Sequence, residues 1–342
     1  MNDVLQHVMK EGKIQRWANK PNHVLTVGVI RDSHEAIWSS TEDGMDGIYE
    51  IGSITKTFTG LLAAIGEERG LWKVSDSLAS FIPEWEKHPF AGETTLRHLV
   101  THTSGLARVP KNISKTVIDR MNPYANYRDD DLMAAVMQEK RPSRRRWNYS
   151  NYGFGLLGWL LAKRTGQRLD EMMNEWIFAP LHMAQSSVAI PSSASLLPVF
   201  KANGKSAKHW EFHDAMAGAG AVHSTVSDML RYLEAHLRDG GTLYRALERS
   251  RQELHAIDAK RGTAMAYGWM MQREKDGSMT YWHNGATYGS CSFAMFNREK
   301  QIGLVILSNF GFSLLGELHP FKMSVDKLAK HLWTRLAGEE HR

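Results

Sequence analysis

The chain has 342 residues, enough to bury a sizeable core, and this length favours one compact unit with two lobes over two independent domains. Its hydrophobic fraction of 42% and charged fraction of 23% are those of ordinary globular proteins. A single cysteine, Cys291, excludes a disulfide within the chain, and the lack of any run of about 18 apolar residues argues against a membrane span.

Positive charge is spread thinly except in one segment. The formal net charge is +5, and the one dense block is residues 140–146, Lys-Arg-Pro-Ser-Arg-Arg-Arg. Such runs are usually solvated loops, whereas nucleic-acid binders concentrate charge in stripes or helices, so we interpret the block as a loop. The alternative is a surface that attracts anionic substrates, because the block lies just before Tyr149.

The first part of the chain predicts a polar helical N-terminus followed by strands. Residues 1–22 contain no apolar stretch of the kind found in secretory signals, which favours a cytoplasmic protein or one whose leader has been removed. Residues 25–30 and 35–39 have the pattern of two paired strands, and residues 48–51 predict a short extended piece. Gly52 then breaks the pattern, and apolar residues recur at helical spacing over 55–69.

The middle of the chain is predominantly helical. The clearest helices are expected over residues 96–101, 129–139, 152–165, 169–177 and 226–237. Thr225 is placed to cap the last of these helices. Residues 191–207 are rich in Ser, Ala and Lys and indicate a connector.

The last third returns to strands. Residues 267–272, 278–283, 290–297 and 302–308 are typical of an antiparallel meander, and residues 321–336 predict a closing helix. Cys291 falls in an apolar alternating segment, which favours a buried core thiol.

The order of strands, helices, strands and helix predicts an α+β fold in which the first and last strands share one sheet. We expect a single domain over residues 1–342. Its sheet lobe would comprise about residues 1–52 and 260–342, and its helical lobe about residues 53–259. A cleft between the two lobes would be the ligand site.

The sequence Ser53-Ile54-Thr55-Lys56 stands at the expected start of a helix. A serine there lies near free backbone N–H groups and the positive end of the helix dipole, and a lysine three residues later lies on the same face. A serine becomes a good nucleophile when a neighbour takes its proton, which a lysine with a pKa lowered by burial can do. The structural alternative is an N-cap serine and a surface lysine.

Two later motifs complete the set. Tyr149-Ser150-Asn151 opens the helix expected at residue 152. A tyrosine beside a cationic lysine shifts toward phenolate and can act as a base, and an asparagine can bind a substrate carbonyl. The structural alternative for this motif is a helix cap.

The third motif, His283-Asn284-Gly285-Ala286, ends an expected strand. Its glycine would let a substrate approach the strand closely, and a backbone N–H there can donate to an oxyanion. The structural alternative is a turn between two strands.

In this order, the three motifs resemble those of the serine β-lactamase and penicillin-binding protein superfamily. The closer resemblance is to its class C-like branch, which includes DD-peptidases, D-aminopeptidases and β-lactamase-like esterases. The resemblance covers about residues 20–335. Besides the three motifs, the segments that carry it are residues 95–106, 149–153, 219–220, 224–225 and 267–269.

The resemblance implies a β-lactamase/transpeptidase-like fold and a serine hydrolase that works through an acyl-enzyme, with no metal and no cofactor. Ser53 would be acylated, Lys56 would accept or relay its proton, and Tyr149 would be the general base and protonate the leaving group. The implied substrate-binding residues are Asn151, His283, Gly285 and Ala286. Asn151 would hold the substrate carbonyl, His283 would tune Tyr149 and orient the substrate, and the backbone N–H groups of Ser53 and Ala286 would form the oxyanion hole.

The third motif departs from the family pattern, because His-Asn-Gly replaces Lys-Thr-Gly or His-Thr-Gly. A neutral imidazole attracts a substrate carboxylate less than an ammonium does, and Asn284 removes a hydroxyl. These departures favour esters and D-amino-acid peptides over β-lactams as substrates. The alternative function is a non-turnover, penicillin-binding-like sensor or binding protein.

The remaining features of the sequence do not predict a cofactor. His98 and His102 have the i, i+4 spacing of helical zinc sites but lack the adjacent Glu and a third ligand, so we favour a packing or capping role. We expect a small-molecule ester, amide or D-amino-acid peptide substrate, no nucleic-acid partner, and a bell-shaped pH profile if Lys56 and Tyr149 share protons. The oligomeric state is left open.

Overall fold

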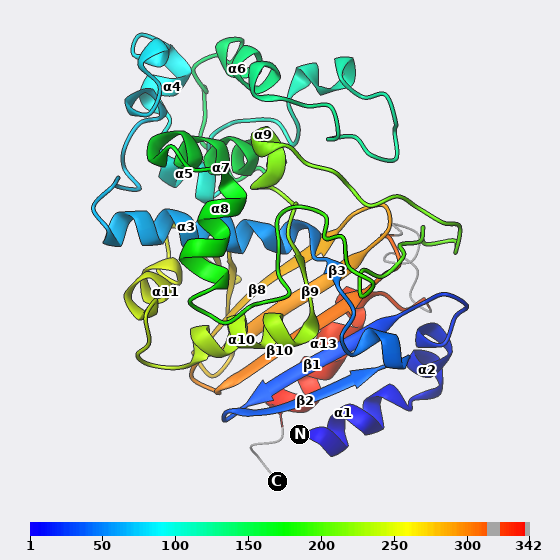
Figure 1. The fold of residues 1–342 in the computed structure, drawn as a ribbon. Coiled ribbons are helices and arrows are strands. Elements are labelled where there is room, and N and C mark those ends of the chain that lie inside the picture. Colours follow the sequence, from blue (N-terminus) through cyan, green and yellow to red (C-terminus); the bar gives the residue numbers. More distant parts are fainter. Residues whose placement is uncertain (313–321, 339–342) are drawn as a thin grey trace.

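An eight-stranded antiparallel sheet organises the computed structural model, which describes residues 1–312 and 322–338 (Figure 1). The strand order is β2-β1-β10-β9-β8-β7-β6-β5. The strands are β1 (Leu25–Arg31), β2 (His34–Ser39), β5 (His255–Asp258), β6 (Thr263–Met265), β7 (Met270–Arg273), β8 (Met279–Ala286), β9 (Cys291–Asn297) and β10 (Ile302–Ser308). A separate pair joins β3 (Tyr49–Glu50) to β4 (His223–Ser224).

The first and last strands share one sheet, as the element order predicted. β1 pairs with β10, and Val27 lies opposite Ile306. The fold is therefore α+β, and β10 has the bounds that its apolar run predicted. β10 is buried along its whole length because helices cover both faces of the sheet there.

The meander differs from the predicted one in three respects. Residues 267–269 form a turn before β7, with Gly268 at φ +82°, and the strands β5 and β6 were not expected. β8 runs to Ala286, so the His283 motif lies within a strand and not in a turn between strands.

Each face of the sheet has its own helical cover. On one face lie α1 (Asn2–Met9) and α13 (Val325–Ala337), with α2 (Gly12–Ala18) beside them. The opposite face carries α10 (Val226–Leu237), whose N-terminus is capped as predicted because Thr225 Oγ1 accepts the Asp228 N–H at 3.2 Å. Residue 321, the first of the expected closing helix, lies outside the described residues.

The other helices lie on the same side of the sheet as α10 (Figure 1). They are α3 (Thr55–Glu68), α4 (Pro89–Glu93), α5 (Leu96–Val100), α6 (Asp129–Met137), α7 (Asn151–Thr165), α8 (Leu169–Met173), α9 (Asp214–Ala217) and α11 (Tyr244–Ser250). α8 continues into a π-helical turn over Asn174–Phe178. One apolar core joins α3, α7 and α10 to the sheet, and the single-domain assignment stays a prediction.

Candidate active site

Ser53 lies at the junction between β3 and α3. A 3-10 turn over Gly52–Ile54 leads into α3, and Gly52 has a positive φ of +50°. A Cβ on Gly52 would stand 2.9 Å from the backbone nitrogen of Ala286, so glycine is needed for both the conformation and the close approach. The backbone of Ser53 is thereby held next to the end of β8.

Lys56 is a basic group within hydrogen-bond distance of the serine. Its Nζ lies 3.0 Å from Ser53 Oγ and donates to the Ala219 carbonyl at 2.7 Å. The side chain is 0% exposed, and burial, helped by the positive charge of Arg108, holds the lysine pKa well below its usual value. A buried amine without a carboxylate partner favours its neutral form, which can accept a proton.

Tyr149 lies against the same amine but differs from the expectation in its ionisation. Lys56 Nζ is 5.0 Å from the centre of the tyrosine ring. Burial raises the pKa of Tyr149 to about 12, and a hydrogen bond with Ser53 and the charge of Arg108 only partly oppose this rise. Tyr149 is therefore a neutral phenol at pH 7, and the predicted shift toward phenolate was wrong because burial outweighs the nearby positive charge.

The second motif also caps a helix. Ser150 Oγ accepts the Gly153 N–H at 2.9 Å and so caps α7, which begins at Asn151. Asn151 lines the cavity beside Ser53, where its Nδ2 donates to the Tyr124 hydroxyl at 3.1 Å. Its Oδ1 is buried and has no hydrogen-bond partner in the part of the chain that the structure describes.

The third motif brings His283 and Ala286 to the site. The His283 ring is buried, its centre lies 6.2 Å from that of Tyr149, and burial together with Lys56 lowers its pKa to about 3. Its imidazole is therefore neutral at pH 7. Asn284 points elsewhere, since it donates to Asp326 at 2.8 Å.

Gly285 serves a different purpose from the one expected. A Cβ at this position would overlap the carbonyl oxygen of Ile51, so the missing side chain admits the backbone before Ser53 and not a substrate. Ala286 lines the same cavity as Ser53.

A cavity of about 140 Å³ opens onto Ser53. Arg108 lies on one side, 5.1 Å from the centre of the Tyr149 ring, and Tyr124, Trp210 and Phe212 form an aromatic wall. Sequence reasoning missed these four residues, because no spacing relates them to the motifs. Only the position of Arg108, two residues after the resembling segment 95–106, pointed toward the site.

Other candidates lie elsewhere. His98 Nδ1 accepts the Thr95 N–H at 3.0 Å, which is the predicted capping role. α5 ends at Val100 and His102 has φ +58°, so the two histidines do not share a helical face. His102 instead packs its ring 4.5 Å from that of Tyr149. The basic residues 140–146 are not among those that line the Ser53 cavity.

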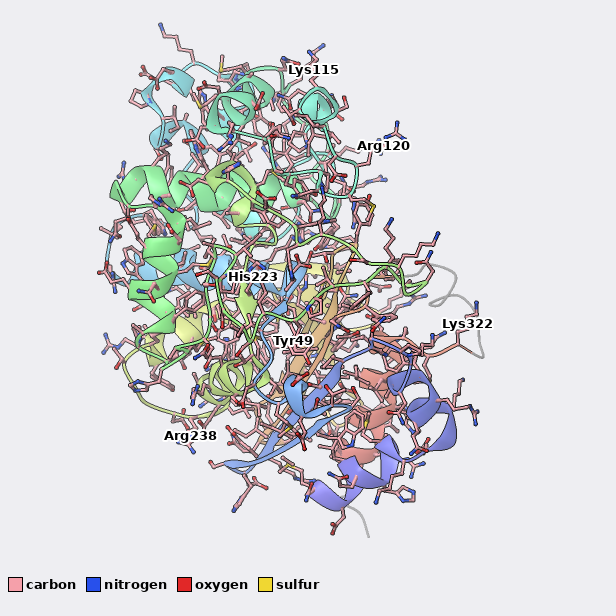
Figure 2. All side chains as sticks on the ribbon, turned by 45° about the vertical axis from the view of Figure 1, so that its right-hand side comes forward. Tyr49, Lys115, Arg120, His223, Arg238 and Lys322 are labelled. Atoms are coloured by element: carbon pink, nitrogen blue, oxygen red, sulfur yellow. The ribbon has the colours of Figure 1, made fainter. Side chains whose placement is uncertain are left out.

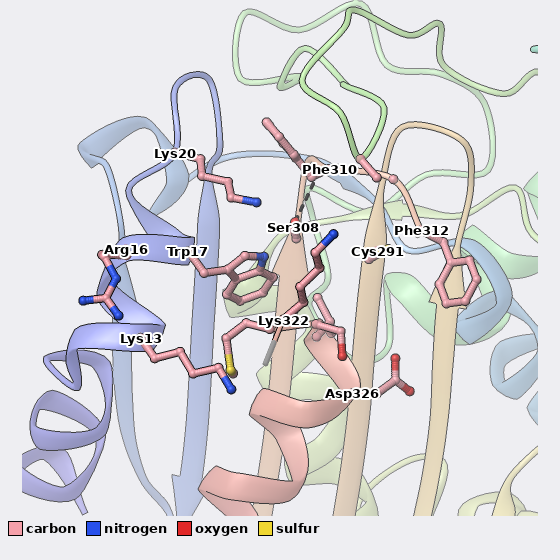
Figure 3. Close-up of a pocket in the computed structure, with 15 residues that line it drawn as sticks. Lys13, Arg16, Trp17, Lys20, Cys291, Ser308, Phe310, Phe312, Lys322 and Asp326 are labelled. Atoms are coloured by element: carbon pink, nitrogen blue, oxygen red, sulfur yellow. Dashed lines mark hydrogen bonds between the residues drawn. The ribbon is translucent and has the colours of Figure 1, made fainter. Parts of the chain in front are cut away.

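Cys291 is only half buried, contrary to the expectation of a core thiol. It is the first residue of β9, where the strand begins at the rim of the sheet. There it lines a hollow of about 390 Å³ together with Trp17, Ser308 and Phe310 (Figure 3). The residues that line this hollow do not include those of the three motifs. No helix within residues 1–312 and 322–338 combines the length and apolar character needed to cross a membrane.

The chain is similar in sequence and fold to known proteins. A family model described as Beta-lactamase matches residues 18–317. A Beta-lactamase from Providencia stuartii is 25% identical over 297 residues, covering 77% of this chain and 73% of that protein. Penicillin-binding protein 4 from Amycolatopsis lactamdurans is 26% identical over 340 residues, covering 89% and 87%. The solved structure of a beta-lactamase/D-alanine carboxypeptidase from Pseudomonas syringae shares the fold, with a TM-score of 0.81, 19% identity and 99% coverage of both chains.

Proposed function

The chain belongs to the Beta-lactamase family of serine hydrolases, and we propose that its acyl-enzyme forms on Ser53, with Lys56 as the group that takes the serine proton. The observation that carries the proposal is the 3.0 Å approach of Ser53 Oγ to a fully buried amine. A neutral lysine held by the Ala219 carbonyl has its lone pair available to the serine hydroxyl.

Acylation then proceeds by attack of Ser53 on the substrate and transfer of its proton to Lys56. Ser53 Oγ attacks the substrate carbonyl carbon while its proton moves to Lys56 Nζ. The backbone N–H groups of Ser53 and Ala286 stabilise the negative oxygen that develops. The leaving group departs with a proton from the Lys56–Tyr149 pair. Water then attacks the ester carbonyl on Ser53 while one of its protons moves to the Lys56–Tyr149 pair, and that proton passes to Ser53 Oγ as the acid product leaves.

Tyr149 acts in this scheme as a neutral phenol. With a pKa of about 12 it is a poor base at pH 7, but it can donate its proton to the leaving group and recover one from Lys56. Asn151, which lines the same cavity, would hold the substrate side chain or carbonyl.

Esters are the substrates that the site supports best. His283 is neutral, so the third motif does not supply the positive charge that a β-lactam carboxylate needs. The aromatic wall of Tyr124, Trp210 and Phe212 suits an apolar acyl or alcohol group.

A carboxylate-bearing substrate, such as a D-amino-acid peptide or a β-lactam, is the second candidate. The exposed Arg108 at the cavity favours it, because a guanidinium can pair with a carboxylate there.

Hydrolysis of p-nitrophenyl butyrate by the wild type and by Ser53→Ala tests the proposal. Ser53→Ala should lose turnover, while Ser192→Ala, which alters an exposed serine, should keep it. Equal turnover by the wild type and Ser53→Ala would remove Ser53 from the mechanism. A stoichiometric burst without steady-state turnover would favour the alternative of a non-turnover binding protein.

A further inference from the structure

Three side chains of types that can bind metals lie close together at β3, the strand that precedes Ser53. Glu50 on β3 pairs with His223 on β4, and His209 reaches the same point from the long connection before α9. One ligand atom from each residue lies within 4.8 Å of the other two. We propose that Glu50, His209 and His223 form a binding site for one divalent transition-metal ion of the Zn²⁺ type.

His223 is the first reason for this proposal. Its side chain is 2% exposed, in the interior above Tyr49 (Figure 2), yet neither ring nitrogen has a hydrogen-bond partner among the described residues. The Ala221 backbone lies close enough to influence the ring but does not meet hydrogen-bond geometry. A buried imidazole without partners loses hydration without compensation, and a metal ion would supply the missing interaction.

The spacing of His209 and Glu50 is the second reason. Nδ1 of His209 lies 3.3 Å from Oε1 of Glu50, but the angle is not that of a hydrogen bond. Ligand atoms that are each about 2.0–2.1 Å from a tetrahedral ion stand about 3.3 Å apart. The two atoms are therefore separated as two ligands of one zinc ion would be.

The carboxylate is also held as a metal ligand should be. The Trp210 N–H donates to Oε1 of Glu50 at 2.6 Å, and Thr287 Oγ1 donates to Oε2 at 2.7 Å. Such outer hydrogen bonds orient ligating side chains. The side chain of His209 is 19% exposed, which leaves a path for the ion and for a water as fourth ligand.

Two histidines and one carboxylate are ligands that zinc and its neighbours accept, whereas Ca²⁺ and Mg²⁺ prefer oxygen alone. The ion would connect β3, β4 and residue 209. Through the hydrogen bond between Glu50 and Thr287, the residue after Ala286, it would also stabilise the end of β8. It would act as a clamp beside the site and take no part in acyl transfer.

Zinc binding by the whole chain tests this site without reference to activity. Protein freed of metal with EDTA would be titrated with Zn²⁺ by calorimetry, and bound zinc would be counted by mass spectrometry after desalting. We expect one zinc per wild-type chain, and an affinity lower by about 100-fold or more in His209→Ala and His223→Phe, because loss of even an outer partner costs 10–100-fold.

The matched control is His236→Phe, which removes another buried histidine whose ring nitrogens have no hydrogen-bond partner within residues 1–312 and 322–338. It should bind zinc as the wild type does, and so should Ser53→Ala, since the site is independent of the serine chemistry. If His223→Phe fails to fold, His209→Ala decides, because that ring is partly exposed. Absence of saturable binding to the wild type, or equal binding by His209→Ala, would overturn the proposal.

Discussion

Lys56 determines at which pH the site is active. Its neutral amine is the form that accepts the serine proton, and burial together with Arg108 lowers its pKa. kcat/KM should therefore rise with pH as Lys56 loses its proton, and it should not fall again below about pH 10, because the pKa of Tyr149 is about 12. The bell-shaped profile expected from the sequence thus has no accessible alkaline limb.

Initial rates of p-nitrophenyl butyrate hydrolysis across pH, for the wild type and two variants, check this prediction. Arg108→Gln removes a positive charge that lowers the Lys56 pKa, so it should move the rising limb to higher pH. Lys56→Met should lower kcat/KM by about 10²–10⁴-fold. Activity that declines between about pH 6 and about pH 9 would contradict the assigned protonation states.

Arg108 decides between neutral and anionic substrates. If it pairs with a substrate carboxylate, Arg108→Gln should raise KM about 10-fold or more for carboxylate-bearing esters and leave KM for p-nitrophenyl butyrate nearly unchanged, since a hydrogen bond to a charged group contributes about 1.5–3 kcal/mol. Arg261→Gln, at an exposed arginine outside the cavity, is the control. An equal change in KM for both substrates would rule out carboxylate recognition.

At the scale of elements, the contact between β8 and the turn before α3 sets the position of Ser53. A methyl group on Gly285 would overlap the Ile51 carbonyl oxygen, which is rigid backbone held by Ser292 Oγ at 2.7 Å. Gly285→Ala should therefore displace Ser53 and lower kcat/KM by about 100-fold, as expected for a shift of about 1 Å.

Gly92→Ala is the matched control for that substitution, because a Cβ at Gly92 in α4 would meet no atom of the described residues within 4 Å. It should leave kcat/KM unchanged. Wild-type kcat/KM in Gly285→Ala would show that this contact does not position the nucleophile.

The elements that sequence patterns predicted best are those whose burial is regular. α10 and β10 have the expected bounds, because apolar residues recur along α10 at helical spacing and β10 is buried along its whole length. β5 and β6 escaped prediction because they are short and lie at the edge of the sheet, where apolar alternation is weak. The chemistry of Gly285 was misjudged because its partner, Ile51, is distant in sequence.

The site was predictable where a motif is local and not where it depends on tertiary contacts. Ser53 and Lys56 are three residues apart, one in the 3-10 turn and the other in the first turn of α3, so their contact follows from spacing. The pKa of Tyr149, the place of Arg108 and the cluster of Glu50, His209 and His223 depend on burial and on residues far apart in the chain.

For the whole molecule, the shared core predicts one cooperative unfolding transition. Buried residues of α3 and α7 belong to the same apolar cluster as Val305 and Leu307 of β10, so the helices and the sheet cannot lose packing independently. Thermal unfolding followed by far-ultraviolet circular dichroism and by tryptophan fluorescence should give coincident curves. Two separated transitions would show that the sheet lobe and the helical lobe are independent domains.

The most direct test of the central claim is the site of covalent labelling by a fluorophosphonate, followed by intact mass and peptide mapping. The account predicts one adduct per chain, on Ser53, formed much more slowly in Lys56→Met and absent in Ser53→Ala. An adduct of equal yield in Ser53→Ala, or an adduct on another residue of the wild type, would contradict it.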